Sequence, residues 1–286
     1  MTPRLPIAAI TDEFSASLRE ALVPMKEIGM TGAELRVIGG KNILDLDDGE
    51  LERAKETLSE AGMRVVSIAS PLLKCVLENG GEPDSRFERD IFASKHTAAD
   101  QPKLAERAFE VAKFFGAPIV RVFSFWRTVA PERCQDAVAR AVGDLAAAAK
   151  REGLIVGLEN EHACNVATGA ETARVLALIP DAGVKVVWDP ANALVAGESP
   201  FPVGYAKLPK GSVVHVHAKD CNMRTGKPEW GPLGTRHVPW KEQIAQLIGD
   251  GYRGYLSLET HWTGPAGDKM EGSRICGWNL LGLSAE

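Results

Sequence analysis

The chain has 286 residues, of which 45% are hydrophobic and 25% charged, a balance typical of a folded protein with a sizeable core. Its formal net charge is -5 and it has no cluster of Lys and Arg, so nucleic acid is not expected as a partner. The first apolar run, Ile7 to Ile10, is too short for a signal peptide or a membrane span, and we expect no membrane association.

Cysteine usage favours a reducing compartment. The five cysteines are odd in number, widely spaced and without a Cys-x-x-Cys pair: Cys75, Cys134, Cys164, Cys221 and Cys276. This pattern fits reduced thiols better than a disulfide framework or a zinc site. We therefore expect a cytoplasmic protein.

Short runs rich in Val, Ile and Ala alternate with longer stretches of helical spacing, which predicts parallel strands joined by crossover helices. The runs are Ile7 to Ile10, Gly32 to Arg36, Arg64 to Ala69, Ile119 to Phe123, Leu154 to Glu159, Val184 to Trp188, Val213 to Ala218 and Tyr255 to Glu259. Most lack polar alternation, as expected of strands covered on both faces. Eight such repeats predict the α/β class and a single-domain (β/α)₈ TIM barrel over residues 1–286.

The helical stretches carry start and stop signals. Ser17 and Glu20 have the spacing of a capping box, and Asp47-Asp48 forms an acidic first turn. An apolar stripe follows that turn at Leu51, Ala54, Leu58 and Ala61. Glycines that fit left-handed C-terminal caps lie between helical stretches and strands at Gly29, Gly62, Gly116, Gly153 and Gly251.

Two segments break this rhythm, one from Ser70 to about Asp100 and one from Asn222 to Pro239. Each follows a predicted strand, so each is expected on the C-terminal face of the barrel, where barrel enzymes build their sites. The second is rich in Gly, Pro and Trp, which is too irregular for a strand or a helix and favours a lid.

The last four predicted strands each end in a side chain that can bind a metal. These residues are Glu159, Asp189, His217 and Glu259. Because the C-terminal ends of parallel barrel strands meet at one rim, the four side chains are expected to point at a common place. Three carboxylates so close would repel one another, and a divalent cation would offset that repulsion. We therefore predict one divalent metal ion.

Three oxygen ligands and one imidazole without a thiolate favour Mn²⁺ or Mg²⁺, with Co²⁺ and Zn²⁺ as competitors. His215 and His217 lie on one face of the same strand, and only one needs to reach the metal. We choose His217, which is nearer the rim, and interpret His215 as a buried supporting residue.

At these residues the sequence resembles the xylose isomerase-like TIM-barrel superfamily, which includes ketose 3-epimerases, inosose dehydratases and, more distantly, endonuclease IV. The resemblance covers nearly the whole chain. It rests on Gly32-Ala33-Glu34-Leu35-Arg36, Leu158-Glu159-Asn160, Trp188-Asp189-Pro190-Ala191-Asn192, His215-Val216-His217-Ala218-Lys219-Asp220 and residues 254–262, GYLSLETHW. Endonuclease IV uses many more histidines than the 6 in this chain, so a DNA-repair role is not favoured.

The resemblance implies that the four residues above are the metal ligands and that Glu159 and Glu259 are also the catalytic acid/base pair. Two departures concern ketose 3-epimerases in particular. Asn192 stands where those enzymes carry a His, and Met223 stands where they carry an Arg, with Arg224 one position away. These departures weaken the expectation of 3-epimerase activity and leave the metal ligands intact.

Further side chains are candidates for substrate binding because they lie at or after the C-terminal ends of predicted strands: Glu34, Lys74, Arg121, Glu161, Asn165, Asn192, Lys219 and Arg224. For Glu34 and its neighbour Arg36, a salt bridge at the rim is an equally good interpretation. The resemblance implies sugar-hydroxyl contacts for Glu161 and Asn165. Trp126, Trp230 and Trp262 could stack on a sugar or simply pack over the barrel mouth.

The first hypothesis for function is a metal-dependent isomerase or epimerase that abstracts a proton next to the carbonyl of a small sugar or sugar phosphate. A dehydratase acting on an inosose or a dehydroshikimate-like hydroxy-ketone is the alternative, because it begins with the same proton abstraction. A non-catalytic sugar-binding barrel is the third reading. The sequence leaves a homo-oligomer open.

Overall fold

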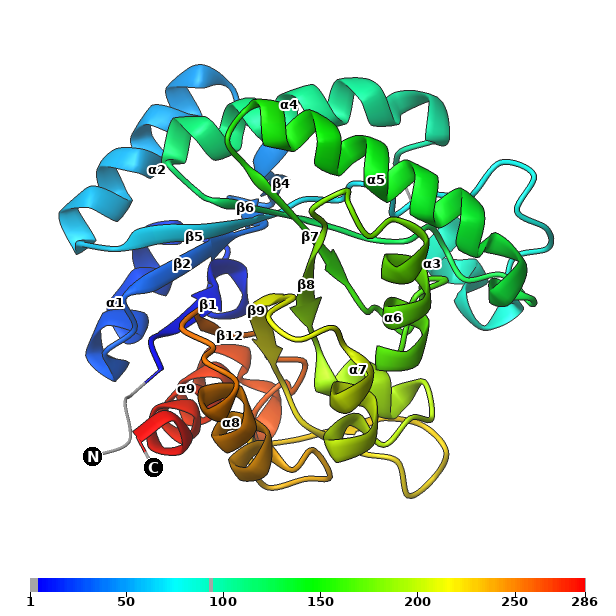
Figure 1. The fold of residues 1–286 in the computed structure, drawn as a ribbon. Helices are drawn as coiled ribbons and strands as arrows, with labels where there is room; N and C mark the ends of the chain where they lie inside the picture. Colours follow the sequence, from blue (N-terminus) through cyan, green and yellow to red (C-terminus); the bar gives the residue numbers. More distant parts are fainter. Residues whose placement is uncertain (1–4, 93–94, 286) are drawn as a thin grey trace.

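The structure, a computed structural model, describes residues 5–92 and 95–285. Eight parallel strands close into a barrel in the order β1-β12-β9-β8-β7-β6-β5-β2 (Figure 1). They are β1 (Ile7–Ile10), β2 (Gly32–Leu35), β5 (Arg64–Ala69), β6 (Ile119–Val122), β7 (Ile155–Glu159), β8 (Lys185–Trp188), β9 (Val213–Ala218) and β12 (Leu256–Leu258). The predicted (β/α)₈ barrel is confirmed.

Helices surround the strands (Figure 1). They are α1 (Leu18–Ile28), α2 (Asp48–Ala61), α3 (Glu88–Phe92), α4 (Gln101–Phe115), α5 (Gln135–Arg151), α6 (Gly169–Leu178), α7 (Pro190–Val195), α8 (Trp240–Gly249) and α9 (Lys269–Ala285). None of the helices in the described part of the chain has the length and apolar character needed to cross a bilayer.

Helix α2 illustrates how the sequence builds one repeat. Asp47 accepts a hydrogen bond from the backbone N–H of Glu50, whose carboxylate accepts from the N–H of Asp47, so two otherwise unpaired donors are satisfied. Leu51 and Leu58 are buried on one face, and each contributes about 1.5–3 kcal/mol by leaving water. The helix ends at Gly62, which has a φ of 69° and a left-handed conformation that glycine adopts without strain.

The N-cap expected at Ser17 is present, since its side chain accepts from the N–H of Glu20. The reciprocal half of the box is replaced by a bond from Ser15 Oγ to the Glu20 carboxylate. At the start of β2, a Cβ on Gly32 would lie 2.7 Å from the ring of Tyr255 and 2.8 Å from Val66. Only glycine therefore allows β2 to pack so closely here.

The segment predicted as an irregular lid is partly a hairpin. Strands β10 (Cys221–Asn222) and β11 (Glu229–Trp230) pair antiparallel after β9. The expectation of no strand here was wrong, because two-residue strands are too short to show a period in the sequence. A second small hairpin, β3 (Val37–Ile38) with β4 (Lys41–Asn42), follows β2.

Candidate active site

The structure brings together the four predicted metal ligands. Glu159 ends β7, Asp189 directly follows β8, His217 lies in β9 and Glu259 directly follows β12. One ligand atom from each lies within 4.8 Å of the others, and all four side chains are buried. Four successive repeats of the chain therefore contribute to one cluster inside the C-terminal rim.

Local sequence fixes the position of Asp189. Its Oδ1 accepts from the N–H of Asn192, 2.8 Å away, so Asp189 is the N-cap of α7, and Pro190 occupies the first helical position. The side chain of Asn160 forms two bonds to the Asp189 backbone, accepting from N–H at 2.8 Å and donating to C=O at 2.7 Å. Asn160 was not predicted as a site residue, although it follows the first ligand directly.

Positive side chains lie among the ligand carboxylates. Lys219 Nζ is 2.8 Å from Asp189 Oδ2 and 2.7 Å from Glu259 Oε2. Arg121 Nη1, from β6, is 2.6 Å from Glu159 Oε2. Both cations were predicted to bind substrate, and in this structure they contact carboxylates. The protein itself therefore supplies part of the positive charge that offsets the repulsion between the carboxylates.

Arg36 is a third cation that contacts carboxylates at the rim. Its guanidinium donates to Asp12 and Glu13, which follow β1, and its Nη1 lies 3.3 Å from Glu259 Oε1. A salt bridge at the rim between strand ends was one of two interpretations for Arg36, and the structure confirms it. Asp12 and Glu13 were missed because the sequence showed them only as the end of an apolar run.

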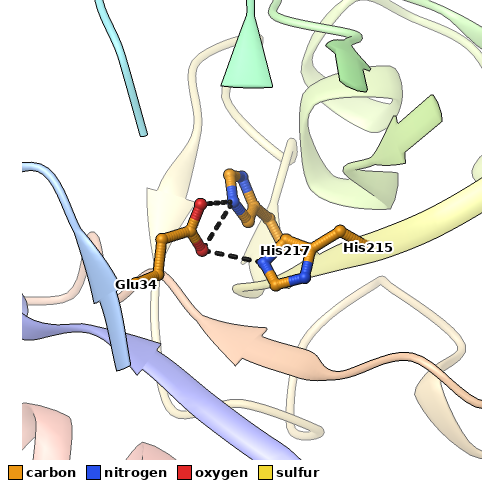
Figure 2. A group of neighbouring side chains, drawn as sticks. All are labelled: Glu34, His215 and His217. Atoms are coloured by element: carbon orange, nitrogen blue, oxygen red, sulfur yellow. Dashed lines mark hydrogen bonds and ion pairs between the residues drawn. The ribbon is translucent and has the colours of Figure 1, made fainter. Parts of the chain in front are cut away.

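Glu34 lies deeper, fully buried inside the barrel (Figure 2). Its carboxylate is hydrogen-bonded to the ring nitrogens of His215 and His217, and it accepts from Ser257 Oγ at 2.7 Å. His215 is likewise buried, as expected, and contacts Glu34. This position directs Glu34 toward the two histidines.

The charge balance still favours a cation at Asp189. Burial raises the pKa of Asp189, and repulsion from Glu259 and Glu159 adds to it, so that the pKa reaches about 6 despite Lys219. Its Oδ2 is buried and accepts no hydrogen bond from the described residues. Lys219 Nζ is close enough for an ion pair but does not have hydrogen-bond geometry. An oxygen-rich set with one imidazole and an available carboxylate oxygen fits Mg²⁺ or Mn²⁺.

Three further candidates are Asn192, Glu161 and Lys74. Asn192 Nδ2 donates to Glu161 Oε2 at 3.2 Å and to Glu159 Oε1 at 3.4 Å, while its Oδ1 lies 2.9 Å from His162 Nδ1. Burial raises the pKa of Glu161, but nearby positive charges, Lys74 first, lower it to about 2. Lys74 Nζ lies 4.3 Å from the centre of the Phe123 ring. Asn192 therefore links Glu161 to Glu159 of the ligand cluster.

Asn165 and Arg224 were also predicted to contact substrate. Asn165 is buried and binds loop backbone, accepting from the N–H of Thr128 at 3.0 Å and donating to the C=O of Trp126 at 3.1 Å. Arg224 is exposed on the loop between β10 and β11. Within residues 5–92 and 95–285, neither side chain forms a hydrogen bond or ion pair with Glu159, Asp189, His217 or Glu259.

Trp230 of β11 lies near Lys219 and His261. The centroid of its ring lies 4.5 Å from the centroid of the His261 ring. Lys219 Nζ lies 5.8 Å from the centroid of the Trp230 ring. The hairpin thus carries an aromatic face to the edge of the site.

Solved structures with this architecture include a 3-keto-D-glucoside 4-epimerase from E. coli, with 17% identity and a TM-score of 0.65 over 96% of this chain and 98% of that one. A xylose isomerase-like TIM barrel protein from Mycobacterium smegmatis in complex with magnesium has 19% identity and a TM-score of 0.67 over 98% and 96%. A probable 3-DHS dehydratase from Bacillus anthracis has 17% identity and a TM-score of 0.69 over 94% and 97%. At these identities the likeness concerns the fold.

No curated protein sequence is significantly similar to the chain. The sequence model of one family, described as xylose isomerase-like TIM barrel, matches residues 23–275, which include all four clustered ligands. The chain belongs to the xylose isomerase-like TIM barrel family.

Proposed function

We propose that the protein is a divalent-metal-dependent isomerase or epimerase of a small sugar-like hydroxy-ketone. The observation that carries the proposal is the buried cluster of Glu159, Asp189, His217 and Glu259 within 4.8 Å. Membership of the xylose isomerase-like TIM barrel family supports it, and so does a fold shared with a sugar epimerase and with a magnesium complex. Mg²⁺ and Mn²⁺ suit the ligands best.

In this proposal Glu159 and Glu259 serve as the acid/base pair. When bound, the metal ion would polarise the substrate carbonyl and make the adjacent C–H bond more acidic. One carboxylate removes that proton and the other returns a proton, so the hydrogen is redistributed without a change in composition. Arg121 holds Glu159 and Lys219 holds Glu259, which keeps both carboxylates in fixed orientations.

Side chains next to the ligand cluster would select the substrate. Glu161 and Asn192 lie next to the ligand cluster and offer hydrogen-bonding groups for hydroxyls. The Trp230 ring presents an apolar face of the kind that stacks on sugar rings. Buried polar groups that need partners discriminate strongly against substrates without the matching hydroxyl.

A dehydratase is the second candidate, favoured by His162. Its side chain is partly exposed, and its Nδ1 is 2.9 Å from Asn192 Oδ1. A protonated His162 could give its proton to a β-hydroxyl that leaves as water after a carboxylate has removed the α proton. The substitution of Asn192 for the His of ketose 3-epimerases is consistent with different chemistry at this position, and a dehydratase shares the fold.

Incubation of metal-replete protein with ketoses, ketose phosphates and inososes in deuterated water tests the proposal. We expect deuterium to appear on a substrate carbon, with the product isomeric to the substrate. A product lighter by one water would establish the dehydratase instead. Tight binding of one sugar without any exchange would contradict both and favour a non-catalytic binding protein. Glu259→Gln is the control, because it removes one base while leaving a side chain of the same size.

A further inference from the structure

The geometry points to Glu34 as the residue that positions His217 for metal binding, by accepting a hydrogen bond from its Nε2 so that Nδ1 becomes the ligand atom. This inference rests on the proposed metal site. It assigns Glu34 a role toward the protein's own histidine in place of a role toward substrate.

The two ring nitrogens of His217 face different neighbours. Nε2 lies 3.2 Å and 3.3 Å from the two oxygens of Glu34 (Figure 2). On the other side of the ring, Nδ1 lies 3.0 Å from Glu159 Oε1 and 3.5 Å from Glu259 Oε2. Nδ1 therefore faces the ligand cluster, and Nε2 faces away from it.

A neutral imidazole carries hydrogen on one nitrogen and a lone pair on the other. A carboxylate offers only acceptors, so Glu34 favours the tautomer with hydrogen on Nε2 and a lone pair on Nδ1. Without Glu34, the neighbouring Glu159 would favour hydrogen on Nδ1, which is the wrong tautomer for binding a metal among the carboxylates. Carboxylate partners of this kind orient histidine ligands in many metal sites.

Glu34 is itself held firmly in place. Its Oε2 also contacts His215 Nε2 at 2.8 Å and accepts from Ser257 Oγ at 2.7 Å, and all of these side chains are buried. Glu34 comes from β2, whereas both histidines come from β9, so the contact crosses the interior of the barrel (Figure 2). The Glu34 carboxylate therefore stays in place if the His217 ring rotates, and its fixed position favours one orientation of that ring.

The same three residues, Glu34, His215 and His217, also satisfy the distance criterion for a second metal site. Their atoms are already linked by hydrogen bonds, and His217 cannot give a lone pair from both nitrogens while it is neutral. A second ion would thus compete with the first for His217. For this reason the geometry favours one ion and a supporting Glu34.

The test compares Glu34→Gln, His215→Phe and wild type for Mn²⁺ affinity and stoichiometry, using competition with a chelator. Glutamine keeps the volume but offers one acceptor oxygen and a donor, so Glu34→Gln is expected to bind Mn²⁺ about 10- to 100-fold more weakly. His215→Phe is expected to bind one ion within about 3-fold of wild type, because His215 does not face the ligand cluster. Glu34→Asp, which keeps the carboxylate, is expected to recover part of the affinity. Thermal unfolding without metal identifies any variant that fails to fold.

A spectroscopic measurement separates positioning from a merely structural role. In wild-type protein loaded with diamagnetic Zn²⁺, ¹⁵N chemical shifts of the imidazole are expected to show His217 with hydrogen on Nε2 and the metal on Nδ1. Three results would overturn the inference. The first is metal bound to Nε2 of His217, and the second is two ions in wild type but one in His215→Phe. The third is wild-type Mn²⁺ affinity in a folded Glu34→Gln. Because these readouts measure binding alone, they stand even if no isomerase activity is found.

Discussion

Arg121 Nη1 lies 2.6 Å from Glu159 Oε2, and both side chains are buried on the neighbouring strands β6 and β7. Replacing Arg121 by Met would remove one of the two positive partners of the buried Glu159 carboxylate and leave only His217. Such losses cost about 3–5 kcal/mol, and we expect Arg121→Met to lower the free energy of unfolding by that amount in urea denaturation. Loss of less than about 1 kcal/mol would show that the pair contributes little. Arg121→Lys, which keeps the charge, is the control.

Lys219 neutralises Asp189 and Glu259 in the absence of metal. In Lys219→Met the three clustered carboxylates lose this cation, so the metal-free protein is expected to melt at a lower temperature. Added Mn²⁺ offsets the same repulsion, and the rise in Tm on adding metal is expected to be larger in Lys219→Met than in wild type. Lys41→Met is a matched control, since Lys41 forms an exposed pair with Glu50. An equal rise in Tm in Lys219→Met and Lys41→Met would argue against the idea that Lys219 and the metal ion offset the same repulsion.

The sequence predicted much of the architecture because each repeat is local. Strands β1, β5 and β9 have the predicted bounds, since buried runs of Val, Ile and Ala define them without reference to the rest of the chain. The convergence of strands β7, β8, β9 and β12 follows from barrel closure alone. For this reason the sequence could predict that Glu159, Asp189, His217 and Glu259 lie close together, as the structure shows.

Contacts across the barrel could not be predicted in this way. Strands β2 and β9 are not neighbours in the sheet, so chain order gives no reason to pair Glu34 with His217. The partners of Arg36 come from the turn after β1 and the end of β12, at sequence distances that no local pattern encodes. Which cation meets which carboxylate depends on side-chain packing, and only coordinates provide it.

Trp230 is expected to act on substrate binding. Its ring lies 4.5 Å from that of His261 at the edge of the site and is only partly buried. Loss of one aromatic face costs about 0.5–1.5 kcal/mol, so Trp230→Ala is expected to raise KM about 2- to 12-fold with a smaller change in kcat. Trp278→Ala removes a 47% exposed tryptophan on α9 and serves as the control. A fall in kcat at constant KM would place Trp230 in the chemical step instead.

The cysteines are expected to be unreactive in the folded protein. All five are buried and free, and burial raises the pKa of Cys75, Cys164 and Cys221 to about 12. Because only the thiolate reacts, the reactive fraction at pH 8 is small, and it increases only as pH approaches the raised pKa. Titration with a thiol reagent at pH 8 is expected to modify no cysteine in native protein and five after denaturation. Rapid native labelling would contradict the buried placement.

Asn160 provides the most selective test of how the protein holds Asp189. Its amide donates to the C=O of Asp189 at 2.7 Å and accepts from the N–H of the same residue, so both halves of the amide are used. Asn160→Asp replaces the NH₂ group that donates to the Asp189 C=O by a carboxylate oxygen, which cannot donate. This loss is expected to lower the free energy of unfolding by about 1–3 kcal/mol. The displaced Asp189 would also bind Mn²⁺ more weakly, because support of a ligand commonly changes metal affinity by about 10- to 100-fold. Asn279→Asp is the matched control, since Asn279 donates to the C=O of Leu233 far along the chain from the ligands. If Asn160→Asp lost stability but kept full Mn²⁺ affinity, the Asn160 amide would support the fold of the rim without setting the position of the Asp189 carboxylate.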